Sequence, residues 1–576
     1  MRYLYSFLFV VTCFSIQAQD STAIEKIFAE IDRIDERYSV DGAYSGKHPE
    51  KYEYKTTEQL IAQAAEYQEQ IALMRSLPRE ELSRQEQISR DIMILRLNDD
   101  VSAVKYKTYL MPFNAEGGFY NSPVFFLSRL PFDDIGDYES YLNWLPSFAD
   151  YIRYNQELLG QGIKENVLRP KLIVNNNIEL LSIWIKNEVE ENPFYRPFQN
   201  MPESISPEDQ KRLIKRANKV IRESILPAYQ DLGTFLKDTY LPASPEEVGI
   251  SSISNGRSYY EDRIRFYTTM DMSPDSVYSL GLQEVARISA KMRKIIADLE
   301  FEGDFAAFIN FLRTDPQFYA KTPQELLNKA AWLSKKAEGQ LPPLFSKLYS
   351  LPFTVEPVPD AIAPNYTGGR AVPGDRKANL PGIYWVNTYD LPSRTLYTLP
   401  ALTLHEAVPG HHLQISLSSE LEGLPAFRTY YYISAFGEGW GLYSEYLGEE
   451  MGMYETPYDL FGRYTYEMWR ACRLVVDVGL HYKGWTRQEA VDYLASNTAL
   501  SLHEVSTEID RYIGWPGQAV SYKIGELTII RLREEATKAL GEAFDIQKFH
   551  ELILQNGSVP LPVLEEEINS YIESTK

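Results

Sequence analysis

The chain is poor in histidine and cysteine and has no long apolar run. Among its 576 residues are seven histidines and two cysteines. We expect Cys13 to be removed with an N-terminal signal, which leaves Cys472 alone and excludes an internal disulfide in the mature chain. No stretch approaches the roughly 20 apolar residues that a membrane-spanning helix needs, so we expect no membrane span.

Positive charge is also scarce. Lysine and arginine together number 58 against 80 aspartates and glutamates, which gives a net charge of −22. This balance argues against nucleic acid or an anionic membrane surface as a partner and favours cationic substrates. Aromatic residues make up 13% of the chain, with 41 tyrosines, a content that excludes a disordered protein.

The first 18 residues are typical of an export signal. Arg2 supplies the positive start, an apolar run extends from Leu4 to Ile16, and Ala18 ends a small-residue cleavage site. The residues before Cys13 make a poor lipoprotein box, so lipid anchoring is a minor alternative. We therefore expect a periplasmic or secreted protein.

Helical patterns dominate the rest of the chain. Capping residues predict helices that start near Ser206, Ser273, Thr322 and Thr486. Strand-like segments are few, and the best are 353–358 and 383–388. We predict a mostly α-helical protein with a small β element before the histidine cluster. We expect a helical N-terminal body at 19–356 and a catalytic zinc-binding region at 357–576.

Three of the seven histidines lie within eight positions. His405, His411 and His412 surround Glu406 in the segment Thr-Leu-His-Glu-Ala-Val-Pro-Gly-His-His. A His-Glu pair followed closely by another histidine is how zinc hydrolases place two imidazole ligands and a general base on one stretch of backbone. The cluster predicts one Zn²⁺ per chain.

The spacing leaves the second histidine ligand open. On a regular helix His411 lies about 120° from His405, whereas His412 lies about 20° from it. An unbroken helix therefore favours His412. Pro409 and Gly410 stand between the histidines, however, and a kink there brings His411 round instead.

A carboxylate from a later helix is expected as the third ligand. Glu438 and Glu445 are seven residues apart in the segment Phe-Gly-Glu-Gly-Trp-Gly-Leu-Tyr-Ser-Glu and so share a helix face. Glycines flank Glu438 and allow a close approach of the backbone to a site. We predict that Glu438 binds the metal and that Glu445 orients a histidine.

Glu406 is the natural general base, because it lies about 100° around the helix from His405 and can reach a water bound to the metal. An oxyanion that forms on the substrate needs a hydrogen-bond donor. Tyr522, which follows a turn and a helix start, is one candidate, and His481 is another.

Arg470 and Arg473 flank Cys472 on a predicted helix. They are placed either to hold a substrate carboxylate in a bidentate manner or to pair with acidic neighbours such as Asp477. Pairing with acidic neighbours is the simpler expectation.

Three motifs together resemble the bacterial domain of unknown function 885 family. They are His-Glu-Ala-Val-Pro-Gly-His-His-Leu-Gln, Gly-Glu-Gly-Trp-Gly-Leu-Tyr and Pro-Gly-Gln-Ala-Val-Ser-Tyr-Lys-Ile-Gly, and the resemblance covers nearly all of the mature chain. That family is itself similar to two-lobed helical zinc peptidases of the thimet-oligopeptidase and thermostable-carboxypeptidase type, which have a deep channel.

The resemblance implies a role for each matching residue. It gives His405 as the first ligand, Glu406 as the base, Glu438 as the third ligand and Tyr522 as the donor to the oxyanion. It maps the Gly-His pair of those peptidases onto Gly410-His411, against the helix-phase argument.

The leading interpretation is an exported zinc metallopeptidase that acts on oligopeptides, with a carboxypeptidase mode of action left open. A zinc hydrolase of another amide, such as a peptidoglycan stem peptide or an N-acyl amino acid, is a second possibility. The non-enzymatic alternative is a helical periplasmic binding protein with a structural metal site. Glu406 separates the two enzymes from the binding protein, because a purely structural metal site has no use for a general base.

Overall fold

The computed structural model describes residues 22–40, 51–121, 127, 130–186, 188–360, 362–363 and 366–576. It is mostly helical with small β-sheets, which confirms the predicted fold class. The export signal predicted for residues 1–18 lies outside the described residues. Within them, no helix is both long enough and apolar enough to cross a membrane.

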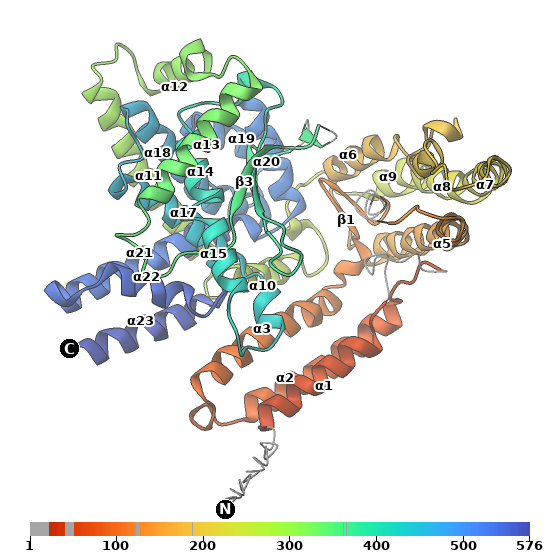
Figure 1. Ribbon diagram of the computed structural model, residues 1–576, viewed down its shortest axis with the longest axis horizontal. Coiled ribbons are helices and arrows are strands. Elements are labelled where there is room, and N and C mark those ends of the chain that lie inside the picture. The colour runs from red at the N-terminus through yellow and green to blue at the C-terminus, as the bar shows by residue number, and fades with distance from the viewer. Residues whose placement is uncertain are drawn as a thin grey trace, which may run out of the picture.

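Three helices near the N-terminus run side by side below the main body in Figure 1: α1 (Ala23–Arg37), α2 (Thr57–Ser76) and α3 (Arg84–Lys105). Each begins with a capping box, in which the N-cap side chain and the third helical residue satisfy each other's backbone groups. Ile31, Met74 and Ile92 are among the residues that these helices bury.

A limb of helices extends to the right of the body in Figure 1. It contains α5 (Ile135–Glu165), α6 (Lys171–Leu181), α7 (Pro207–Val220), α8 (Leu226–Phe235) and α9 (Leu241–Ala243). The short hairpin of β1 (Phe113–Asn114) and β2 (Gly117–Gly118) lies at its base.

The chain from α7 to α9 is one continuous helical rod interrupted by two wider turns. These π-helical turns are Ile221–Ile225 and Leu236–Tyr240, and each ends two residues before a proline, Pro227 or Pro242. A proline inside a helix has no N–H to donate and clashes with the preceding turn. A wider turn before each proline lets the rod continue.

The main body is built on two long helices that pack along each other, α11 (Pro274–Asp298) and α18 (Pro457–His481). Every residue from Phe461 to His481 is buried, so α18 is the central helix. It contacts α19 (Arg487–Asn497) and α20 (Leu502–Gly514). The same body contains α10 (Gly256–Thr268), α12 (Phe305–Thr314) and α13 (Pro323–Gly339). The starts of α11, α13 and α19 confirm the helix starts expected from their capping residues.

A three-stranded sheet has the order β3-β5-β4. The strands are β3 (Phe353–Pro357), β4 (Gly369–Val372) and β5 (Gly382–Val386), with β3 parallel and β4 antiparallel to β5. β3 and β5 match the two predicted strand segments. β4 is an edge strand of this sheet and contacts α14 (Leu399–Glu406).

The remaining helices complete the body: α15 (His411–Ser419), α16 (Phe427–Tyr430), α17 (Ser434–Glu450), α21 (Ser521–Leu540), α22 (Ile546–Leu554) and α23 (Leu561–Thr575). α17 and α21 cross closely, because two glycines face each other there. A Cβ on Gly439 would lie 2.5 Å from the Cα of Gly525.

Two large hydrophobic cores hold these elements together, and each takes residues from both halves of the chain. One joins Trp144 of α5 to Trp469 of α18, and the other includes Ile31 of α1 and Trp440 of α17. Neither core divides at residue 356. The division into two regions at that residue stays a prediction.

Candidate metal centre

His405 and His411 lie on two different helices. His405 is on the last turn of α14, which ends at Glu406, and α15 begins at His411. The four residues between them form a turn instead of a continuation of the helix, and Ala407 and Gly410 have non-helical backbone angles. The regular helix assumed in the phase argument for His412 is therefore absent.

The turn is fixed by two contacts. Any Cβ on Gly410 would clash with the carbonyl oxygen of His405, so only glycine fits there. The indole N–H of Trp440 donates a hydrogen bond of 2.8 Å to the carbonyl of Pro409. The tryptophan of the Gly-Glu-Gly-Trp-Gly motif on α17 thus holds the turn that separates the two histidines.

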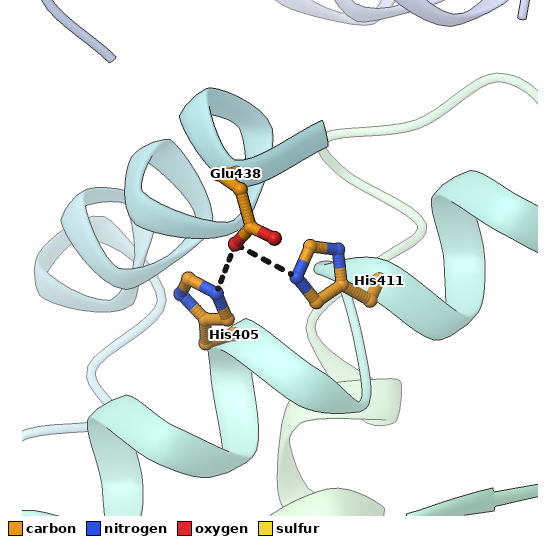
Figure 2. Close-up of side chains that lie close together, drawn as sticks. All are labelled: His405, His411 and Glu438. Carbon is orange, nitrogen blue, oxygen red and sulfur yellow. Dashed lines mark ion pairs between the residues drawn. The ribbon is translucent and has the colours of Figure 1, made fainter. Parts of the chain in front are cut away.

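His405, His411 and Glu438 converge from three helices (Figure 2). Glu438 Oε2 lies 3.5 Å from His405 Nε2 and 3.4 Å from His411 Nε2. The three ligand atoms all lie within 4.8 Å of one another. Both histidines are buried, and the Glu438 side chain is 16% exposed.

The two distances from Glu438 can be compared with those of hydrogen bonds and of a metal site. Ion-pair hydrogen bonds measure about 2.7–2.9 Å. Tetrahedral zinc bound at about 2.0–2.1 Å places its ligand atoms about 3.3 Å apart. The observed 3.4 and 3.5 Å match the edge of such a tetrahedron. Three protein ligands also leave one position open, as in catalytic zinc sites.

The second ring nitrogen of His405 is held by a buried carboxylate. His405 Nδ1 lies 2.8 Å from Glu445 Oε1, and Glu445 Oε1 lies 3.5 Å from Arg470 Nη2. This arrangement fixes the ring orientation and leaves Nε2 to face Glu438 and His411. The structure thus brings Glu445 to His405, and its role in orienting a metal ligand stays a prediction.

Electrostatics make the cluster attractive to a cation. Burial acts to lower the pKa of His405, but the Glu438 and Glu445 carboxylates outweigh it and raise that pKa to about 9. Burial acts to raise the pKa of Glu438, but the two imidazoles hold it well below its usual value. The carboxylates thus favour positive charge on the imidazoles, and a bound metal ion would supply that charge in place of a proton.

Each glycine of the Gly-Glu-Gly-Trp-Gly motif makes room for a neighbour. A Cβ on Gly437 would clash with the ring of Tyr432, and one on Gly439 would meet α21. A Cβ on Gly441 would lie 2.7 Å from Cε1 and Nε2 of His405. The glycines therefore allow α17 to approach the imidazole, the phenol and the neighbouring helix at once.

Glu406 points to the edge of the sheet. Its Oε2 accepts a hydrogen bond of 2.8 Å from the backbone N–H of Ala371 on β4. Its charge contributes to the raised pKa of His405, so its carboxylate lies within electrostatic reach of the cluster. Glu406 is thus beside the three convergent side chains and not one of them, and its role as a general base stays a prediction.

A small cavity of about 30 Å³ lies along the same face of α14. Gly368, Leu402, Tyr466 and Glu504 are among its lining residues. Leu402 is four residues before Glu406, so the two side chains share a helix face. Burial raises the pKa of Glu504 to about 7, although Arg394 in the same cavity opposes the shift.

His412 lies outside the cluster. Its Nε2 donates a hydrogen bond of 2.9 Å to the carbonyl of Leu351, and its ring packs against Tyr349 and Phe353. Adjacent residues of a helix diverge by about 100°, so His411 and His412 at the start of α15 face different partners. The structure corrects the helix-phase argument and brings His411, not His412, to His405.

His481 is also placed away from the cluster. Its Nδ1 accepts a hydrogen bond from Ile250 N–H at 3.1 Å, and its Nε2 donates one to the carbonyl of Tyr512 at 3.0 Å. Burial lowers its pKa to about 4. The neutral ring joins three segments of the body and is not directed at the metal site.

Arg470 and Arg473 are buried, whereas Tyr522 is half-buried and lies within electrostatic reach of Tyr432. The Arg473 guanidinium lies 4.2 Å from the centre of the Tyr522 ring and pairs with Glu508 at 3.1 Å. Arg470 pairs with Glu445. Both arginines thus have acidic partners, as the simpler expectation held, but these partners are not Asp477.

Tyr432 is a site residue that the sequence did not reveal. Its hydroxyl donates a hydrogen bond of 3.0 Å to Glu438 Oε1, and its ring centre lies 6.5 Å from that of His411. Burial of the hydroxyl, together with the Glu438 carboxylate, raises its pKa well above the usual value. One tyrosine among 41 carries no local signal; only its place shortly before the glycine motif is suggestive.

Solved structures of similar proteins share this fold. One, from Colwellia psychrerythraea and described as a "putative lipoprotein", is 27% identical with a TM-score of 0.84, and the match covers 96% of this chain and 99% of that one. Another, from Shewanella oneidensis and described as a "putative lipoprotein of unknown function", is 18% identical with a TM-score of 0.69, and covers 94% and 98%.

No curated protein matches the chain. The family described as "Bacterial protein of unknown function (DUF885)" matches residues 41–568. Since this match spans most of the sequence, the chain belongs to that bacterial family of unknown function.

Proposed function

We propose that this protein is an exported zinc metallopeptidase that hydrolyses oligopeptides. The observation that carries the proposal is the convergence of His405, His411 and Glu438, whose two carboxylate–imidazole distances are close to the edge of a tetrahedral zinc site. The cluster has three protein ligands, whereas structural zinc sites are closed by four, and this supports a catalytic site. Glu406 beside the cluster supports it as well, because a catalytic site needs a general base.

A zinc ion held there would polarise the substrate carbonyl and lower the pKa of a water in the open position. Glu406 then has the role of general base. It takes the proton of the attacking water and returns it to the leaving amine. The hydrogen bond from Ala371 keeps its carboxylate beside β4, the edge strand along which an extended peptide can lie.

Glu445 and Arg470 act through His405. The Glu445 carboxylate holds the Nδ1 proton, so Nε2 keeps its lone pair for the metal. Arg470 compensates the buried charge of Glu445. Tyr522 stays a proposed donor to the oxyanion, as the likeness to the helical zinc peptidases implies.

Export is part of the proposal. The apolar N-terminal segment with its small-residue cleavage site supports it. The description of two structural relatives as lipoproteins supports it as well, because lipoproteins are exported.

The test combines metal analysis with peptide cleavage. Elemental analysis of native protein should find about one zinc per chain in both the wild type and Glu406→Gln. A peptide library should be cleaved by the wild type, and Glu406→Gln should lower kcat by about 10²- to 10⁴-fold. The exposed Glu422→Gln is the matched control and should cleave normally. A protein without zinc, or a Glu406→Gln variant with wild-type rates, would refute the proposal.

A further inference from the structure

Tyr432 approaches the metal cluster from the side opposite the histidines. Glu438 presents Oε2 to His405 and His411 (Figure 2). Its other oxygen, Oε1, accepts the Tyr432 hydroxyl at 3.0 Å. The hydroxyl therefore lies one carboxylate group away from the ligand atoms.

The position of Tyr432 is fixed by its surroundings. Gly437, one turn into α17, leaves the space that the phenol ring occupies. The next residue, Ile433, is anchored by a hydrogen bond of 2.8 Å from its N–H to Ser558 Oγ. These two contacts fix the place of the ring and of the backbone that follows it.

Tyr432 is more exposed to solvent than the two histidines of the cluster. The residue is 43% exposed, whereas His405 and His411 are 2% and 7% exposed. Tyr522, the donor expected from the sequence, is half-buried, and the Arg473 guanidinium lies 4.2 Å from the centre of its ring. Of the two phenols, Tyr432 is the more exposed, and among the described residues it is the one with a hydrogen bond to a proposed ligand.

We propose that Tyr432 is a further catalytic residue of the proposed hydrolysis, whose hydroxyl leaves Glu438 Oε1 and donates a hydrogen bond to the substrate carbonyl oxygen as that oxygen becomes an oxyanion. This inference rests on the proposed function. No bond to Tyr432 forms or breaks; its proton stays on the phenol while its acceptor changes. The interaction is stronger in the transition state than in the ground state, which is the condition for a gain in kcat.

The experiment compares Tyr432→Phe with Tyr430→Phe in the zinc-loaded, full-length protein. Tyr430 is a neighbouring tyrosine that is 69% exposed. We expect Tyr432→Phe to lower kcat about 10²- to 10³-fold, the loss seen when one oxyanion donor is removed. KM should stay within about twofold and the Kd for zinc, measured by chelator competition, within about threefold. Tyr430→Phe should match the wild type in all three.

Two results would overturn the assignment in a wild type that cleaves peptides. One is an unchanged kcat in Tyr432→Phe. The other is a weaker zinc affinity with a kcat that recovers fully in excess zinc, since Tyr432 would then only support Glu438. A wild-type protein that holds zinc but cleaves no peptide refutes the proposed function itself and takes this assignment with it. Activity of the wild type thus separates the two failures.

Discussion

Replacing Gly441 by alanine should weaken zinc binding, although none of the proposed ligands is replaced. The new Cβ would lie 2.7 Å from Cε1 and Nε2 of His405, whereas carbon atoms in contact lie about 3.5–4.0 Å apart. Either the ring or the helix must then move by about 0.8 Å to restore that contact distance. Zinc–ligand distances tolerate only about 0.2 Å.

Neither partner can move freely. The His405 ring is held at Nδ1 by Glu445 at 2.8 Å. α17 is held against α21 by the contact of Gly439 with Gly525. We expect the Kd for zinc to rise at least 10- to 100-fold, which is the loss seen when the support of a metal ligand is disturbed. This corresponds to about 1.4–2.7 kcal/mol.

Two alanine variants serve as controls for Gly441→Ala. A Cβ on Gly339, at the end of α13, would meet none of the described residues within 4 Å, so Gly339→Ala should leave zinc binding and thermal stability near wild type. Gly448→Ala overpacks the same helix α17 against Leu404 and Tyr454. It should lower the unfolding temperature and retain zinc. Chelator competition and thermal melting are the assays, and a wild-type Kd for zinc in Gly441→Ala refutes the reasoning.

Three further predictions concern individual side chains. His411→Ala should lose zinc while His412→Ala keeps about one per chain, as elemental analysis will show, because His412 bonds to a backbone carbonyl instead. Glu445→Gln should bind zinc about 10- to 100-fold more weakly in chelator competition, with one ion still bound at saturation. Burial lowers the pKa of His481 to about 4 in the folded protein. Between about pH 6.5 and this value, His481 is therefore protonated in the unfolded chain but stays neutral in the folded one. Stability contributed by this group should therefore fall by about 1.5 kcal/mol from about pH 6.5 to about pH 5, and urea unfolding of His481→Gln should lack that part of the decline.

The sequence predicted those features that depend on short-range chemistry. Thr486 and Ser273 cap helices because their side chains satisfy nearby backbone N–H groups, and such signals are local. Glu438 could be selected as a candidate ligand because its flanking glycines stand in the same segment. Glu445 could then be selected as a residue near the same site, since two residues seven apart on a helix share a face.

Features set by tertiary contacts could not be predicted in this way. Arg473 pairs with Glu508 on α20 and not with the nearby Asp477, and no local pattern indicates that choice. Tyr432 owes its place to a glycine that receives its ring. The helix-phase argument for His412 was wrong because it assumes one continuous helix. In the structure one helix ends at Glu406 and the next begins at His411.

That break is what makes a six-residue spacing compatible with one metal ion. On a single regular helix, residues six apart diverge by about 120° and cannot face one ligand. Ending α14 after Glu406 frees the next helix to start in a new direction, so His411 meets Glu438 at nearly the same distance as His405 does. α17 supplies both the carboxylate and, through Trp440, the hydrogen bond that holds the turn. The glycine motif and the histidine motif therefore form one structural unit, and neither is expected to bind zinc without the other.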